Sequence, residues 1–300
     1  MGNKSIKFNI LMNIILTMSN FIFPLITFPY VSRILLPSGT GKVSFATSFI
    51  SYFVIFAQMG IPTYGIRACA KVRDNKEQLS RTAQELLIIS VVMCIMAYVI
   101  FFMALASIQK LQQEKALYIC MSSTILFTTI GVEWLYKATE QYGYITKRSV
   151  LFKFIALVLM FLLVHEKNDY LIYGIITIFA STASNILNLI NIRKIIILKP
   201  LGNYNFKRHI KAVGIFFAMT CAATIYTNLD NVMLGFMKTD VDVGYYNAAV
   251  KVKTILVSIV ISFGAVLLPR VTYYVEHNKM DLLEKITKKV LNIFLYCPSR

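Results

Sequence analysis

Long stretches without a charged residue constrain this chain more than any other feature. Six of them are largely apolar and run through Phe8–Ser32, Val43–Ile66, Leu86–Gln109, Ala116–Val132, Tyr170–Ile192 and Ala212–Leu229. Two further apolar stretches, at 145–164 and 243–269, contain a few basic residues. About 20 apolar residues suffice for a helix that crosses the roughly 30 Å hydrocarbon core of a bilayer. The sequence therefore predicts an all-α, polytopic membrane protein with eight complete spans and the start of a ninth near Leu291.

The composition agrees with a membrane protein. Hydrophobic residues make up 57% of the 300 residues and the mean hydropathy is +0.64, whereas soluble domains are about 45–50% apolar. The first apolar run is longer than the core of a signal peptide and no small-residue cleavage site follows it, so we expect a true first span there. The five cysteines lack metal-ligand spacing, and we expect them to be buried as small apolar residues.

The net charge of +17 could indicate a nucleic-acid partner, but its distribution argues for membrane topology. With a cytoplasmic N-terminus, the alternating loops hold 22 Lys and Arg residues on the inner side and 6 on the outer side. Such a bias is the positive-inside rule of membrane proteins. We therefore expect a cytoplasmic N-terminus and no nucleic-acid partner.

Spans one and two resemble spans seven and eight. Gly41 and Gly244 are 203 positions apart and each lies near the start of a span, while Arg67 and Arg270, also 203 apart, lie near its end. Chance similarity between apolar helices is the alternative explanation. Because six spans separate the two copies, they would face the same way, as in transporters built from parallel repeats.

This repeat predicts the domain organisation. Residues 1–200 would form a first six-span bundle, and residues 201–300 would begin a second bundle with spans seven, eight and an incomplete ninth. Two repeats of this length would exceed about 400 residues, so the 300-residue chain is expected to be truncated. Asp74–Glu77 and Asp281–Glu284 have the spacing of a helix-capping box, which predicts a short helix in each of these inner loops.

Six segments, in order, resemble one family of membrane transporters. They are PLITFPYVSRIL (24–35), YFVIFAQMGIPTYGIR (52–67), GVEWLYKATEQYGYITKRSVLFK (131–153), IYTNLDNVMLGFM (225–237), VGYYNAAVK (243–251) and LLPR (267–270). Together they resemble the Wzx-type polysaccharide flippases, a branch of the multidrug/oligosaccharidyl-lipid/polysaccharide export superfamily. The last segment, LNIFLYCPSR, does not continue as the ninth span of that family would.

The resemblance implies MATE-like architecture, with two six-helix bundles that face each other across a central cavity. The substrate would be a repeat unit of O-antigen, capsule or lipopolysaccharide, linked to undecaprenyl pyrophosphate and moved from the inner to the outer leaflet of the bacterial cytoplasmic (inner) membrane. Membrane lipids and a polysaccharide polymerase with its export machinery would be the other partners. The resemblance implies a transporter and no enzyme. It implies no metal or cofactor, and coupling to a proton or sodium gradient is left open.

A cationic path inside the spans would suit an anionic headgroup. Moving a small ion from water into a low-dielectric medium costs on the order of 20 kcal/mol in idealised estimates, so a phosphate needs compensating charge. Lys153 lies inside the fifth predicted span, and Lys251 and Lys253 lie inside the eighth. Intramembrane charges usually face a cavity, although long lysines can also reach back to the interface. Both roles stay open for these three lysines.

Arg33 and Asp230 are candidates at the outer mouth of the bundles. Arg33 is expected at the end of the first span, before a turn made by the proline and glycines of 37–41. It could bind the phosphate bidentately as the headgroup emerges, anchor the helix at the interface, or pair with Asp230 of the seventh span. Asp230 could instead carry a coupling proton or sodium ion.

Arg67 and Arg270 are candidates at the inner ends of the second and eighth spans. They could meet the headgroup on entry, or they could simply anchor the helices by the positive-inside rule. Glu133 and Lys137, spaced as i,i+4 neighbours, are interpreted as helix-end residues beside Trp134, in an aromatic belt at the membrane surface.

Three other functions stay open from the residues alone. A multidrug or cation antiporter of the same superfamily should favour carboxylates within its spans, and the deep charges here are lysines. A membrane glycosyltransferase or polymerase could use the pattern Asp240-Val-Asp242, but that pattern is common by chance and falls on the predicted outer side, away from nucleotide sugars. A scaffold of the export assembly without transport activity is the third.

The charge bias predicts that position 167 lies outside the cytoplasm and position 199 inside it. A cysteine placed at Lys167, in a chain without its native cysteines, should react with an impermeant maleimide added to cells with a permeable outer envelope. A cysteine at Lys199 should react only after the inner membrane is lysed. The reverse pattern of labelling would contradict this topology.

Overall fold

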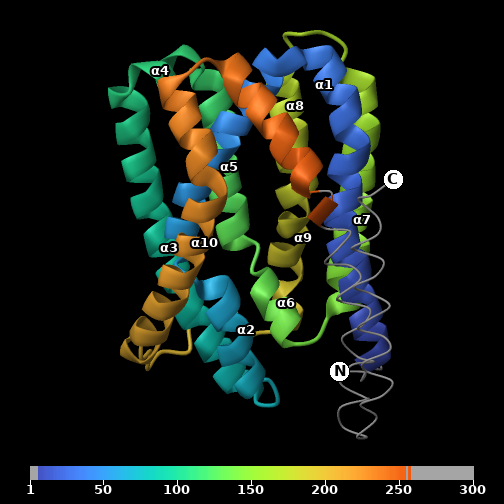
Figure 1. Cartoon of the computed structure of the whole chain (residues 1–300). Coiled ribbons are helices and arrows are strands. Elements are labelled where there is room, and N and C mark those ends of the chain that lie inside the picture. Colours follow the sequence, from blue (N-terminus) through green and yellow to red (C-terminus); the bar gives the residue numbers. More distant parts are fainter. Residues whose placement is uncertain (1–5, 255, 258–300) are drawn as a thin grey trace, which may run out of the picture. The chain divides into compact units, whose positions relative to one another are not determined.

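The computed structural model describes residues 6–254 and 256–257. All regular structure in these residues is helical, which confirms the predicted all-α class. The elements in chain order are α1 (Ile6–Gln58), α2 (Ile61–Lys71), α3 (Lys76–Ser107), α4 (Gln109–Gln113), α5 (Lys115–Ile130), α6 (Glu133–Ala138), α7 (Tyr142–Leu163), α8 (Tyr170–Ile178), the π-helical turn η1 (Phe179–Ala183), α9 (Ser184–Asn191), the 3₁₀ turn η2 (Ile192–Lys194), α10 (Lys207–Met237) and a further helix over 240–254 (Figure 1).

The chain divides into two compact units, residues 1–248 and 249–300. The elements from α1 to α10 all belong to the first unit. Of the second unit, only residues 249–254 and 256–257 are described, and they are helical. The predicted boundary between two bundles at residue 200 stays a prediction.

A helix occupies each of the seven predicted spans that lie wholly in the described residues. Five helical stretches are long and apolar enough to cross a membrane: Phe8–Lys71, Lys76–Ser107, Lys115–Ala138, Tyr170–Lys194 and Lys207–Met237. The first stretch covers two predicted spans, and α7 has the length of a span but carries the basic residues Lys147, Arg148 and Lys153. The chain is therefore a multi-pass membrane protein, and the count of eight spans stays a prediction.

α1 consists of two helices joined at a kink. Leu36 has a φ of 56° and a ψ of 176°, outside the helical region, between two helical segments. A residue before proline is disfavoured in the helical region, and Pro37 follows directly. The predicted turn is thus a break of one residue, and Gly39 and Gly41 belong to the second helix.

Segments predicted to share a side of the membrane gather at one end of the helices. In Figure 1, α4 and the connection before α8 lie at one end, while α2 and α6 lie at the other. Ion pairs join predicted outer residues, Lys42 to Glu114 and Lys110 to Asp240. This alternation agrees with the predicted topology. Which end faces the cytoplasm stays a prediction.

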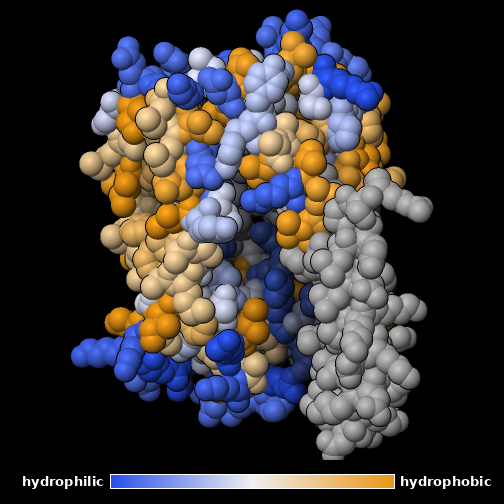
Figure 2. All heavy atoms as spheres, viewed as in Figure 1, coloured by the Kyte–Doolittle hydropathy of each residue, from blue (hydrophilic) through white to orange (hydrophobic). Residues whose placement is uncertain are grey.

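The outward faces of the helices are apolar. Ile95, Phe154 and Leu162, for example, are each at least 60% exposed. On the face seen in Figure 2, apolar residues form a band between two polar ends. Side chains of this kind are expected where the surrounding solvent is lipid and not water. Inside, the long α1 packs against α3, α5, α7 and α10.

The inner loop before α3 differs from its prediction. The helix begins at Lys76 and its N-cap is Asn75, whose side-chain oxygen accepts hydrogen bonds from the backbone N–H groups of Glu77 and Gln78 at 3.1 and 3.0 Å. The predicted cap Asp74 lies one residue too early to reach these donors. No separate short helix forms, because α3 runs on without a break. The matching box at Asp281–Glu284 lies outside the described residues.

The two glycines that marked the repeat lie against each other. A Cβ atom on Gly41 would lie 1.8 Å from the carbonyl oxygen of Asp240, and one on Gly244 would lie 2.0 Å from the carbonyl oxygen of Pro37. Each glycine thus faces the backbone of the other helix. Small residues of this kind allow membrane helices to approach closely. The parallel repeat stays a prediction.

Gly41→Ala should destabilise this contact, because the added methyl group would overlap the backbone near Asp240. Overpacking of this kind typically costs about 1–3 kcal/mol, and we expect a lower melting temperature of the purified protein in detergent. Gly214→Ala in α10 is the matched control, since nothing lies within 4 Å of its added Cβ. Equal melting temperatures for the two variants would contradict the close backbone contact.

Candidate functional site

A polar pocket of about 230 Å³ opens within the helices near α6. It is lined by Gln58, Pro62, Thr128, Glu133, Trp134, Lys137, Ser181 and Asn185. These residues come from α1, α2, α5, α6, η1 and α9. Figure 2 shows hydrophilic residues inside the apolar band, over the region where Figure 1 places α6 and α9. A partly open pocket with charged lining residues therefore lies between these helices.

The pocket exists because α5 stops early and the chain turns inward. Val132, with a φ of 40°, separates α5 from α6. The carbonyl groups freed at the end of α5 accept hydrogen bonds from two amides of α9: Asn188 Nδ2 donates to Gly131 at 2.6 Å and Asn185 Nδ2 donates to Phe127 at 3.1 Å. The hydroxyl of Tyr136 on α6 donates back to the Asn188 carbonyl at 2.7 Å. Polar groups at a helix end inside a membrane need such partners.

The predicted aromatic belt is wrong. Trp134 is 6% exposed and Tyr136 is fully buried, so these rings lie inside the protein rather than at its surface. The physical reason is the close packing of α6 on α2, where a Cβ atom on Gly65 would lie 2.7 Å from the indole ring. Because α6 is drawn inward, Glu133 and Lys137 line the pocket.

Three charged groups form a chain beside the pocket. Lys137 Nζ lies 2.8 Å from Glu133 Oε1, and Arg148 Nη2 of α7 lies 3.7 Å from Glu133 Oε2. The Arg148 side chain is almost fully buried, and its Nη1 donates to the carbonyl of Ser184. In the sequence, Arg148 is one of the 22 cations of the predicted inner side, and no site was predicted at it. Its place inside the predicted span 145–164 was the signal that could have identified it.

Lys153 lies on another side of α7. Its Nζ donates to Ser19 Oγ at 2.8 Å and to Asn20 Oδ1, both on α1. Five residues separate it from Arg148, which turns the two side chains about 140° apart around the helix. Among the described residues no carboxylate pairs with Lys153, so neutral groups hold its ammonium within a span.

Arg33 and Asp230 are not paired with each other. Arg33 is exposed and makes no hydrogen bond or ion pair with the described residues. Asp230 accepts a hydrogen bond from the Tyr246 hydroxyl, and no ion pair is formed between it and the described cations. The structure therefore places Arg33 near the kink of α1 without the carboxylate partner considered for it.

The other predicted cations are dispersed. Arg67 on α2 stacks on the ring of Phe216 of α10, with its guanidinium 5.0 Å from the ring centre. Lys251 and Lys253 lie in the helical residues of the second unit, where Lys251 is partly buried and Lys253 is exposed. Arg270 lies outside the described residues. Within residues 6–248, Arg33, Arg67 and Lys153 have different surroundings and do not form one cluster. The roles predicted for Lys251, Lys253 and Arg270 stay predictions.

The pattern Asp240-Val-Asp242 has structural partners. Asp242 accepts hydrogen bonds from the hydroxyl and the backbone N–H of Thr239, at 2.7 and 3.1 Å, and so caps the helix that begins at 240. These hydrogen bonds lower the pKa of the Asp242 carboxyl. Asp240 lies 4.0 Å from Lys110. Within residues 6–254 and 256–257, no group of three or more His, Cys, Asp or Glu side chains is arranged to hold a metal ion.

A buried ionic cluster at the α2–α3–α10 junction was not predicted. Glu85 of α3 is fully buried. Its Oε2 lies 2.5 Å from Arg208 Nη2 and 2.7 Å from His209 Nε2, and its Oε1 accepts the backbone N–H of Asn205 at 2.7 Å. His209 Nδ1 lies 2.8 Å from the hydroxyl of Tyr64 on α2. The cluster therefore joins three helices, and both the carboxylate and the imidazole are fully hydrogen-bonded.

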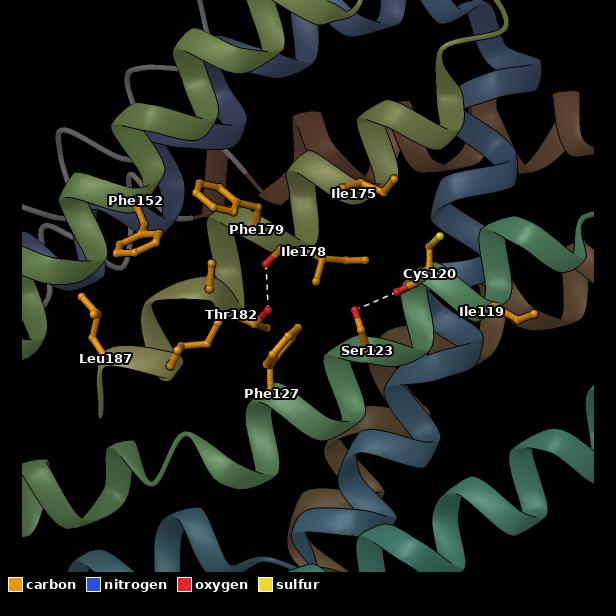
Figure 3. A pocket seen from close by; sticks show the side chains of 12 residues that line it. Ile119, Cys120, Ser123, Phe127, Phe152, Ile175, Ile178, Phe179, Thr182 and Leu187 are labelled. Atoms are coloured by element: carbon orange, nitrogen blue, oxygen red, sulfur yellow. Dashed lines mark hydrogen bonds between the residues drawn. The ribbon is translucent and has the colours of Figure 1, made fainter. Parts of the chain in front are cut away.

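An apolar groove of about 520 Å³ adjoins the polar pocket. Figure 3 shows its lining, in which the hydroxyls of Ser123 and Thr182 donate to the carbonyls of Cys120 and Ile178 within their own helices. The other lining side chains are apolar or small. Segments α5, η1 and α9 contribute to both sites: Thr128, Ser181 and Asn185 line the polar pocket, whereas Phe127, Thr182 and Ile186 line the groove.

Comparison with known proteins decides the family. A profile described as "Polysaccharide biosynthesis protein" matches residues 6–275. The chain belongs to this family. The match confirms the resemblance predicted from the six sequence segments.

Two curated relatives of this family member carry the name "Putative O-antigen transporter". The one from Escherichia coli (strain K12) is 23% identical over 288 residues, which cover 95% of this chain and 69% of the relative. The one from Shigella dysenteriae is 23% identical over 272 residues, which cover 89% of this chain and 67% of the relative. Both are named for transport and not for a catalysed reaction. No solved structure matches the chain significantly.

Glu85→Ala should strongly destabilise this polysaccharide biosynthesis protein, because it leaves Arg208 and His209 without their buried partner. Breaking a buried ion pair typically costs about 3–5 kcal/mol, which we expect as a large fall in melting temperature in detergent. Glu77→Ala on the same helix is the control, since its exposed pair with Arg81 is worth about 0.3–0.5 kcal/mol. A similar small loss for both variants would show that the cluster does not hold the helices together.

Proposed function

We propose that this protein is a flippase that moves lipid-linked oligosaccharides from the inner to the outer leaflet for the synthesis of a cell-surface polysaccharide. The observation that carries the proposal is the match of residues 6–275 to the polysaccharide biosynthesis family, whose two relatives here are named as O-antigen transporters. The substrate class is an oligosaccharide on a polyprenyl pyrophosphate carrier. The membrane is the bacterial cytoplasmic membrane, and membrane lipids are its direct partners.

Charges within the spans support an anionic substrate. Lys153 is held by neutral groups only, and the chain of Lys137, Glu133 and Arg148 has one more cation than anion. A drug-cation antiporter would be expected to place an excess of carboxylates there. Cations that stay charged in a span usually serve a substrate or ion pathway.

The neighbouring pocket and groove support an amphiphilic substrate. A lipid-linked sugar has a polar headgroup and a long apolar chain, and both parts must be accommodated during transfer. The polar pocket and the apolar groove share the walls formed by α5, η1 and α9. This arrangement would let a headgroup enter the protein while an apolar chain stays near the lipid.

The alternatives receive less support. For a glycosyltransferase or polymerase, the D-x-D pattern would need two free carboxylates, and here Asp242 caps a helix while Asp240 lies beside Lys110. A scaffold without transport activity would not require charged groups enclosed by the spans. We also propose that a proton or sodium gradient drives transport, with Asp230 as the carrier of the ion. The protein would associate with a polysaccharide polymerase. No cofactor is invoked.

Lys153→Met should reduce surface polysaccharide about tenfold when the gene carrying this chain complements a host that lacks its own O-antigen transporter. The expected loss corresponds to one charge-assisted contact of about 1.4 kcal/mol. Lys153→Arg should keep most of the export, because it keeps the charge. Lys147→Met, which removes an exposed charge from the same helix, is the control for topology. Full export by Lys153→Met, at equal protein level, would exclude this lysine from the path.

A further inference from the structure

The Arg148 guanidinium is buried with two of its nitrogens unsatisfied. Its side chain is 3% exposed, and among the described residues neither Nε nor Nη2 has a hydrogen-bond partner. The distance of 3.7 Å from Nη2 to Glu133 is too long for a hydrogen bond. Arginine cannot give up its proton in proteins, and a buried unpaired donor is costly. A group that supplies acceptor oxygens here would therefore be strongly favoured.

Glu133 connects this guanidinium to the polar pocket, because it lines the pocket and its Oε2 lies 3.7 Å from Arg148 Nη2. The carbonyl of Ser184 accepts a hydrogen bond from Nη1 of Arg148. In the sequence, Ser184 lies between Ser181 and Asn185, which both line the pocket. Glu133 lies between Arg148 and Lys137. An anion that took the place of the Glu133 carboxylate would therefore lie near both Arg148 and Lys137.

We propose that this pocket binds a phosphate or diphosphate group, with Arg148 and Lys137 as its cationic ligands and Glu133 as an internal anion that the ligand displaces. The inference rests on the proposed function, since the headgroup of a lipid-linked oligosaccharide supplies such a group. Arginine recognises phosphate through paired N–H donors, and Nε and Nη2 form one such pair. When the site is empty, the Glu133 carboxylate balances part of the charge and keeps both cations from facing an apolar medium.

The size and chemistry of the pocket agree with this ligand. A volume of about 230 Å³ holds about seven waters at roughly 30 Å³ each, which is room for a diphosphate but not for several sugar rings. The amide of Gln58 and the second N–H of the Asn185 amide could donate hydrogen bonds to phosphate oxygens. The hydroxyls of Thr128 and Ser181 donate to carbonyls of their own helices. The sugar chain would have to lie elsewhere.

The chain contains its own reporter for this site. Trp134 is the single tryptophan of the sequence and lines the pocket. Its fluorescence in the purified, detergent-solubilised protein should change saturably on titration with farnesyl diphosphate. Inorganic pyrophosphate should compete for the same site, and farnesol should not. An effect of farnesol equal to that of farnesyl diphosphate would assign the signal to the apolar chain and overturn the phosphate site.

Variants test each role. Arg148→Gln should raise the dissociation constant for farnesyl diphosphate at least tenfold, and Arg148→Lys less, because it keeps the charge but loses the fork of donors. Glu133→Gln should lower the constant severalfold, since the ligand no longer competes with a carboxylate. Lys147→Gln removes an exposed charge next to Arg148 and should leave binding unchanged.

If Arg148→Gln fails to fold, Lys137→Gln gives an independent test, because this side chain is about one-third exposed; it too should weaken binding about tenfold. Unchanged binding in the folded cation variants, or weaker binding in Glu133→Gln, would overturn the inference. Export measured in the complementation host separates the two proposals. If the unaltered protein fails to export but its binding of farnesyl diphosphate depends on Arg148, the flippase proposal is refuted and the phosphate site stands. If export is normal but binding does not depend on Arg148, only the phosphate site is refuted.

Discussion

The hydrogen bonds from the amides of Asn185 and Asn188 to the end of α5 are the interaction on which the region around α6 depends. In lipid, a helix cannot end unless its free carbonyl groups find partners within the protein. These two amides supply them and allow the chain to leave α5 after 16 residues and turn inward as α6. Without that turn, Trp134 would not be enclosed and Glu133 would not face the interior. The polar pocket is therefore a consequence of a satisfied helix end.

The two buried ionic clusters, around Glu85 and around Arg148, differ in how completely their charged groups are hydrogen-bonded. Around Glu85, one carboxylate receives hydrogen bonds from an arginine, a histidine and a backbone amide, so the cluster is complete without a ligand. Around Arg148, two of the three guanidinium nitrogens have no acceptor among the described residues, and the nearest carboxylate is shared with a lysine. A complete cluster stabilises an arrangement of helices, whereas an incomplete one is poised to accept a further group. This contrast separates an architectural role for the first from a ligand-binding role for the second.

Close backbone packing distinguishes the contact of Gly41 and Gly244 from the Glu85 cluster. At the glycines the backbones of α1 and of the helix from 240 meet without intervening side chains, and Phe45 fills the space beside Gly235 of α10. This packing depends on the close approach of the two backbones, and the ion pair of Lys110 with Asp240 lies beside it. At the other end, the Glu85 cluster must lose charged hydrogen bonds before the helices can part.

The sequence by itself determined the class of protein, the helices and the family. The uncharged runs allow only helices in lipid, because every backbone group must be satisfied within its own segment. Six ordered motifs were enough to find the family. The sequence also identified Lys153, Gly41 and Gly244 as residues of interest, because a charge within an apolar run and a shared spacing can be recognised without coordinates. Tertiary structure alone decided that Arg148 is buried beside Glu133, that Trp134 is internal, and that Glu85 meets residues more than 100 positions away. These contacts join distant helices, and their partners depend on which face each helix turns inward, which a nearly uniform apolar run does not specify.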